Sequence, residues 1–212
     1  MILYGSSFSP FVRKVLAFAA EKGVAIDLHR VGRGSDDPAF REANPLGKMP
    51  ALRDGDYLLA DSSAIVAYIE ALHPEPALIP AEPRARGTAM FWDEYGDAEL
   101  FDAIRPLFFN RVVSPRFEGK PGDLAAADAS EADVVPGVLA YLEARIPESL
   151  FLVEDRITLA DLAVVSPLVN LEHAGGTLDG FPRIAAYKAA ILARPSFAGL
   201  VEKERALLAR MG

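Results

Sequence analysis

The first third of the chain alternates short apolar runs with helical patterns. Ile2 to Tyr4 predicts a short buried strand, and the apolar spacing that follows predicts a helix that begins at Pro10 and stops at Gly23. The pattern next predicts a strand over 25–31, a short helix over 38–43, a hairpin of strands over 51–53 and 57–59, and a helix over 62–72. This βαβαββα order describes an α/β unit of about 75 residues.

The rest of the chain is helical in its periodicity. Long helical patterns predict helices over 84–109, 123–145, 159–172, 183–193 and 196–211. Pro106, Pro136 and Pro167 fall inside three of them, so we expect kinks or breaks there.

Prolines also mark a boundary between the two kinds of pattern. Four of them lie between Pro74 and Pro83, and such a stretch cannot continue a helix. We therefore predict an α/β domain over 1–78, a Pro-rich linker over 79–85 and an all-helical domain over 86–212.

Composition and charge remove several classes of function. The 212 residues include no cysteine, so any reactive sulfur must belong to a ligand, and thiolate metal sites are excluded. A net charge of -8, with no run of Lys and Arg, argues against a nucleic-acid binder. No basic leader precedes an apolar run, and no apolar run approaches the ~20 residues of a membrane span, so we expect a cytoplasmic protein. The three histidines, His29, His73 and His173, show no ligand spacing, and we predict no metal.

Four segments together are similar to one known family. Ser9-Pro10-Phe11-Val12-Arg13-Lys14-Val15 resembles a serine-type active-site segment, and 44–52 resembles a loop that carries a cis-proline. Asp61-Ser62-Ser63-Ala64-Ile65 resembles a γ-glutamyl-binding segment, while 158–161, with 194–197, is similar to the family's helical domain. On these motifs the chain resembles the cytosolic glutathione transferases over its whole length. The features are those of a serine-type, bacterial-type member with tau-, zeta- and theta-like stretches.

The resemblance implies a fold and a chemistry. The fold is a thioredoxin-like domain followed by an all-helical domain, usually as a homodimer, and glutathione is the co-substrate. The glutathione thiol has a pKa near ~8.5, so little of it is thiolate at neutral pH. The Ser9 hydroxyl can donate a hydrogen bond to the sulfur, and the helix end at Pro10 adds a favourable field. The alternative is that Ser9 only caps the helix, and Ser6 and Ser7 are rival serines.

The same resemblance assigns further glutathione contacts. If the Met49–Pro50 bond is cis, the Met49 backbone can pair with the cysteinyl backbone of the tripeptide. Lys48 either approaches the glycyl carboxylate or is simply solvated. Ser62 either binds the γ-glutamyl carboxylate or caps its helix. Asp61 would face the α-amino group of the tripeptide, although its side chain is shorter than the Glu or Gln of many relatives.

The electrophile pocket is less determined by the sequence. Phe8 is one candidate wall, and a zeta-like stretch over 104–111 adds Arg105, Phe109 and Arg111 as candidates. Asp161 is expected to be structural, because Thr158 and Asp161 have the spacing of a capping box at a helix start.

Three functions remain open at this point. The leading hypothesis is conjugation of glutathione to a small hydrophobic electrophile, as in detoxification. A glutathione-dependent isomerase of the maleylacetoacetate type is a second hypothesis, weakened because the zeta-like segment at the sulfur is absent. A non-catalytic glutathione-binding or scaffold protein on the same fold is the third.

Overall fold

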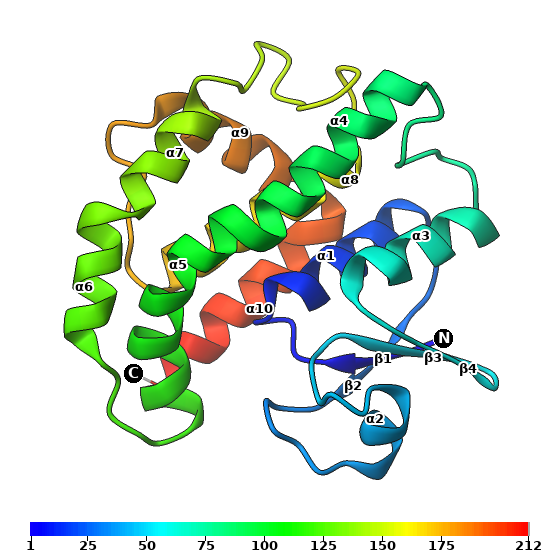
Figure 1. The fold of residues 1–212 in the computed structure, drawn as a ribbon, viewed down its shortest axis with the longest axis horizontal. Helices are drawn as coiled ribbons and strands as arrows, with labels where there is room; N and C mark the ends of the chain where they lie inside the picture. Colours follow the sequence, from blue (N-terminus) through cyan, green and yellow to red (C-terminus); the bar gives the residue numbers. More distant parts are fainter. Residues whose placement is uncertain (212) are drawn as a thin grey trace.

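The computed structural model describes residues 1–211 and shows an α/β domain beside a helical domain (Figure 1). The first domain has the predicted βαβαββα order, which confirms the fold class. Its elements are β1 (Ile2–Gly5), α1 (Pro10–Glu21), β2 (Asp27–Arg30), α2 (Pro38–Ala43), β3 (Ala51–Asp54), β4 (Tyr57–Ala60) and α3 (Ser62–Leu72). The second strand is shorter than the predicted 25–31, whereas α2 and α3 have the predicted bounds.

The sheet has the strand order β2-β1-β3-β4 and is covered on both faces. β1 is parallel to β2, and β3 is antiparallel to both β1 and β4. Because side chains alternate along a strand, Leu3 and Leu52 pack on the face of α1 and α3, whereas Tyr4 and Ala51 pack against Phe40 of α2. The carboxyl end of β1 therefore delivers the chain to the N-terminus of α1.

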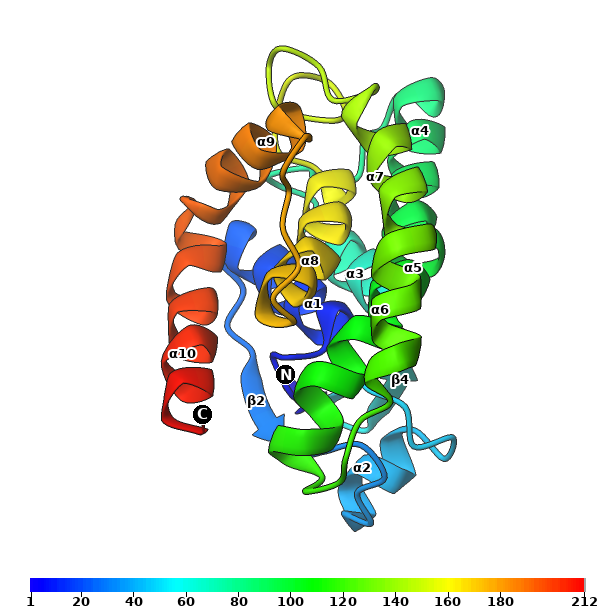
Figure 2. The same ribbon diagram turned by 90° about the vertical axis from the view of Figure 1, so that its left-hand side faces the viewer.

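The helical domain surrounds one buried helix. Figure 2 shows α8 in the interior, with α9 and α10 on one side and α4 to α7 on the other. Nearly every residue of α8 is buried, which suits a helix that is apolar all round. The elements are α4 (Pro83–Glu94), η1 (Tyr95–Leu100), α5 (Phe101–Phe108), η2 (Phe109–Phe117), α6 (Leu124–Asp133), α7 (Val135–Glu143), α8 (Leu159–His173), α9 (Pro182–Leu192) and α10 (Pro195–Met211).

Two of the expected helices differ from the structure. The first continues beyond Phe109 to Phe117 and contains two π-helical segments, η1 and η2. The second is divided at Val134, because Pro136 lies in the first turn of α7 and cannot continue α6.

At Pro167 no break occurs, and α8 runs through it as one helix. Proline has no N–H, so the carbonyl of Ala163 loses its usual helical donor at this point. This carbonyl lies so close to Gly96 of η1 that a Cβ built there would be 2.7 Å from the Ala163 oxygen. The absence of a side chain at Gly96 is therefore a requirement of the η1–α8 contact.

Among residues 1–211, no single helix is both long and apolar enough to cross a membrane. The pair α9 and α10, bent by 100° at their junction, reaches the required length and hydropathy only when the two helices are taken together.

Candidate functional site

A pocket of about 550 Å³ opens where the two domains meet. Its walls are mostly apolar, with several phenylalanines, and its polar groups come from the α/β domain. The apolar lining consists of Phe8, Phe11, Leu46, Met49, Phe101, Phe108, Phe109, Val113 and Phe117. The polar and charged lining consists of Ser6, Ser9, Arg33, Arg41 and Lys48. Such a pocket suits an apolar ligand with a polar or anionic end.

Ser9 lies in this pocket, directly before α1. Its backbone is extended, with φ -75° and ψ 126°, and its N–H donates to the Ser6 carbonyl at 2.9 Å. Within the described residues, the Ser9 hydroxyl makes no capping hydrogen bond to the helix. Because Pro10 has no N–H and the next two N–H groups begin a helix, the positive end of the helix dipole meets the pocket beside this hydroxyl.

The cis-proline loop forms another part of the pocket wall. The Met49–Pro50 bond is cis, as the resemblance implies. Asn44 holds the loop, because its side-chain amide donates to the Lys48 carbonyl at 2.6 Å and its oxygen accepts from the Leu46 N–H at 3.1 Å. The Lys48 side chain is exposed at the rim. The structure thus brings together Ser9, Lys48 and Met49 around one opening.

The start of α3 lies outside the lining of this pocket. Asp61 caps the helix, since its carboxylate accepts from the N–H groups of Ser63 at 2.9 Å and Ala64 at 3.1 Å. The φ of Asp61 is 80°, in the left-handed region that non-glycine residues seldom adopt. The Ser62 side chain is buried, and its hydroxyl donates to Asp97 at 3.3 Å. The N-cap is therefore Asp61, not Ser62.

A buried cluster of charges lies beneath this helix start, and the sequence reasoning missed it. The Lys14 ammonium group is 2.7 Å from Asp93 and 2.5 Å from Asp97, and it donates to the Ser63 hydroxyl at 3.2 Å. Burial raises the pKa of Asp97 to about 6 in spite of the attraction to Lys14. Burial lowers the pKa of Lys14, but the two carboxylates outweigh it, so that pKa lies above its usual value. A lysine on the buried side of α1, next to Arg13, is the one sequence signal that points to this cluster.

The four candidates for the electrophile pocket divide into two pairs. Phe8 and Phe109 line the pocket. Arg105 and Arg111 are not among the described residues that line it. The exposed Arg105 pairs with Asp102 at 3.4 Å, and Arg111 is held by Asp128 at 2.7 Å and Glu131 at 2.6 Å, on α6.

Asp161 and the possible metal ligands form no part of this site. Asp161 is buried at the start of α8, where it accepts from the N–H groups of Thr158 and Leu152, both at 2.9 Å. Burial raises the pKa of the Asp161 carboxyl to about 6. Over the described part of the chain, no group of three or more His, Asp or Glu side chains is arranged to hold a metal ion.

Comparisons with known proteins match both domains of the chain to one family. The family model "Glutathione S-transferase, N-terminal domain" matches residues 3–77, and "Glutathione S-transferase, C-terminal domain" matches residues 110–204. A glutathione S-transferase of Hyoscyamus muticus is 32% identical over 95% of this chain and 98% of its own length. A stringent starvation protein A homolog of Coxiella burnetii is 29% identical over 98% of this chain and 94% of its own length.

A solved structure of glutathione S-transferase-I with bound lactoylglutathione superposes with a TM-score of 0.82, at 26% identity, over 95% of this chain and 98% of that one. Sequence and fold thus lead to the same group of proteins. Because both halves match models of one family and a 32% identical relative is covered almost completely, the chain belongs to the glutathione S-transferase family of enzymes.

Proposed function

We propose that this enzyme activates the glutathione thiol through the Ser9 hydroxyl and transfers the sulfur to a small hydrophobic electrophile. The observation that carries the proposal is the placement of Ser9, whose hydroxyl is not used as a cap and lies in the shared pocket at the N-terminus of α1. A hydroxyl donor and the positive end of a helix both favour a thiolate over a thiol. Lowering the thiol pKa by about two pH units requires roughly 2.7 kcal/mol, which these two groups can supply.

The rest of the glutathione molecule binds to polar groups of the α/β domain. The Met49 backbone pairs with the cysteinyl backbone as an added strand, at the loop that ends in Pro50. Lys48 binds the glycyl carboxylate, and Arg41, which also lines the pocket, adds a second cation that the sequence reasoning did not name. The start of α3 binds the γ-glutamyl end through Ser62 and Asp61. The solved relative with bound lactoylglutathione supports a glutathione adduct at such a site.

The electrophile occupies the aromatic part of the pocket. Phe8 and Phe109 lie there, together with Phe11, Phe101, Phe108 and Phe117. Since these side chains offer apolar faces and no charge, they suit a small hydrophobic acceptor. Arg105 and Arg111 are left out of this proposal, because each is engaged with carboxylates elsewhere.

The proposal also includes a detoxifying role in the cytoplasm and a homodimer. Exposed apolar side chains on both domains support the dimer, namely Tyr57 and Leu72 on the first and Phe91 on the second. Sedimentation equilibrium at micromolar concentration tests it, and a monomer at every concentration would refute it.

The test of function is titration of glutathione by calorimetry, with the ultraviolet absorbance of bound thiolate followed between pH 5 and 9. The wild-type protein should bind glutathione with a thiolate midpoint well below that of the free thiol. Ser9→Ala should raise this midpoint and lower turnover at pH 7 while binding stays nearly unchanged. Of the two rival serines, Ser6 lines the pocket and Ser7 does not appear in its described lining. Ser6→Ala therefore tests the rival, and Ser7→Ala is the matched control.

Two results would refute parts of the proposal. An unchanged midpoint and rate in Ser9→Ala would remove Ser9 from the mechanism. Failure of the wild-type protein to bind millimolar glutathione would remove the transfer function and leave a partner-binding protein.

A further inference from the structure

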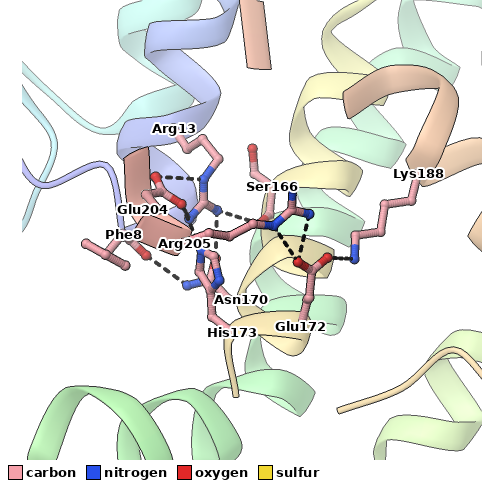
Figure 3. Close-up of polar contacts among 9 residues, drawn as sticks. All are labelled: Phe8, Arg13, Ser166, Asn170, Glu172, His173, Lys188, Glu204 and Arg205. Carbon is pink, nitrogen blue, oxygen red and sulfur yellow. Dashed lines mark hydrogen bonds and ion pairs between the residues drawn. The ribbon is translucent and has the colours of Figure 1, made fainter. Parts of the chain in front are cut away.

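Two polar clusters join α8 to its neighbours, and only one of them reaches the site (Figure 3). In the outer cluster, Glu172 of α8 pairs with Lys188 of α9 and with Arg205 of α10, at 2.7 Å for the latter. In the inner cluster, Arg13 of α1 pairs with Glu204 of α10 at 2.7 Å. The side chains of this second pair are almost completely buried.

The inner cluster continues from Arg13 to the loop that carries Ser9. The Arg13 guanidinium donates to the Asn170 side-chain oxygen at 2.8 Å and to the Ser166 carbonyl at 2.7 Å. The Asn170 amide nitrogen then donates to the Phe8 carbonyl at 2.8 Å (Figure 3). That carbonyl belongs to the peptide bond that leads directly into Ser9.

The direction of every hydrogen bond in this series is fixed by chemistry. An ionised Glu204 can only accept, and Arg13 can only donate. Asn170 must therefore turn its oxygen to Arg13, which leaves its amide nitrogen as the donor to Phe8. Burial and attraction to Arg13 act in opposite directions on Glu204, and the pKa of its carboxyl lies below the usual value, so the acceptor state persists at neutral pH. A single arrangement of these side chains satisfies all of them.

A second contact holds the same residue from its side chain. The His173 ring is 2.9 Å from Glu204 through Nε2, and its centroid is 5.8 Å from that of the Phe8 ring. Phe8 is thus held at its carbonyl by Asn170 and at its ring by His173. Other contacts of this loop are the Ser9 N–H bond to the Ser6 carbonyl and the packing of the Phe8 ring on Phe117, whose centroids are 5.0 Å apart.

We propose that Asn170 is a positioning residue, which fixes the Phe8 carbonyl and thereby aims the Ser9 hydroxyl at the glutathione sulfur. This inference rests on the proposed role of Ser9. A hydrogen bond to sulfur depends steeply on donor placement, and a small displacement of a catalytic group lowers rates strongly. A buried ion pair such as Arg13–Glu204 adds little net stability, so its use here is to give Asn170 one orientation.

The experiment compares two variants at Asn170 with a control in the outer cluster. Asn170→Ala removes both hydrogen bonds, whereas Asn170→Asp keeps an acceptor for Arg13 and replaces the donor to Phe8 with an oxygen. Glu172→Gln, two residues further along α8, weakens the contact between α8 and α10. It leaves the hydrogen bond to the Phe8 carbonyl in place. Each protein is first shown to be folded by its circular dichroism and cooperative unfolding.

Two measurements are then made on each folded variant. The first is the midpoint of the bound thiolate, and the second is amide hydrogen exchange over residues 6–9 without ligand. Both Asn170 variants should raise the midpoint of the bound thiolate by at least about half a pH unit. At a pH below the midpoint, this shift lowers the thiolate fraction roughly threefold. Exchange should be faster in both, and S-hexylglutathione, which has no thiol to activate, should bind as in wild type. Glu172→Gln should change neither measurement.

The outcomes separate this inference from the proposed function. If the wild-type thiolate midpoint is depressed but the Asn170 variants match it, the positioning role is wrong and the role of Ser9 stands. If the wild-type midpoint equals that of the free thiol, the proposed function fails, and the exchange rates alone decide whether Asn170 holds the loop. Equal exchange in Asn170→Ala and Glu172→Gln would overturn the inference in either case.

Discussion

Replacement of Asp97 by asparagine should change how the stability of the protein depends on pH. Asp97 lies in η1, with its carboxylate 2.5 Å from the Lys14 ammonium group and within reach of the Ser62 hydroxyl at 3.3 Å. Its side chain retains 22% exposure. Burial, with the neighbouring Asp93 adding repulsion, raises its pKa from 3.8 to about 6, and Lys14 offsets this only in part.

The sign follows from proton binding in the two states. Between about pH 4 and pH 6, the folded protein holds a proton on Asp97 that the unfolded chain has released. The contribution of Asp97 to stability is therefore fully present below pH 4 and is lost as the pH rises through 6. The difference between the two pKa values corresponds to about 3 kcal/mol in the free energy of unfolding.

In Asp97→Asn this titration is absent. Lys14 stays protonated throughout the window, because its pKa lies above the usual value. Its attraction to the ionised Asp97 carboxylate is already included in the Asp97 pKa, so it adds no further pH dependence. The stability of the variant relative to wild type should therefore improve by on the order of 2–3 kcal/mol from pH 4 to pH 7.

Urea unfolding at half-unit steps from pH 4 to pH 7 measures this difference. Asp102→Asn, which removes an exposed carboxylate from the following helix, controls for the loss of one negative charge. A difference between Asp97→Asn and wild type that stays constant with pH, or moves against the variant as the pH rises, would refute the reasoning.

Two further predictions concern backbone positions. Gly96→Ala should destabilise the protein by about 1–3 kcal/mol, because its Cβ would lie 2.7 Å from a backbone oxygen of α8. Gly87→Ala in α4, which has open space around it, should instead stabilise the protein by about 0.5–1 kcal/mol. Urea unfolding of both variants measures these changes in the free energy of unfolding. Equal changes in the two variants would contradict the packing argument. Asp61→Ala should lower stability by about 1–2 kcal/mol, since it removes the acceptor that caps two N–H groups of α3. Asp61→Asn should lower it less, because asparagine keeps an acceptor and tolerates the φ of 80°. Thermal unfolding that does not separate the two variants would contradict this.

The first domain was predictable because its elements are short and sharply bounded. Proline at the start of α1 and α2 and Gly23 after α1 mark ends that local chemistry alone determines. The helical domain was less so. Its first helix extends to Phe117, and the π turns in η1 and η2 do not follow the 3.6-residue period on which the prediction relied.

The same π turns explain why the pocket wall was predicted in part. They rotate successive side chains differently from an α-helix, so the facing of Arg105 and Arg111 could not be read from spacing. Phe8 lines the pocket because it adjoins Ser9 in the chain, whereas its role toward an electrophile stays a prediction. Phe101 and Phe117 come from elements whose rotation only the packing decides.

The buried charges escaped prediction for a different reason, which bears on how the site is built. Each cation of α1 finds its partner far away in the sequence, Arg13 at Glu204 and Lys14 at Asp93 and Asp97. Glu21, at the end of the same helix, pairs with Arg194 at 2.7 Å. All of these partners belong to the helical domain, so that domain fixes the helix whose first turn adjoins Ser9. Removing the carboxylate partners of either cation while the domain stays in place would leave a buried charge unpaired, at a cost of several kcal/mol. The residues that contact glutathione in the proposal lie in the α/β domain, yet their geometry depends on the helices packed against α1.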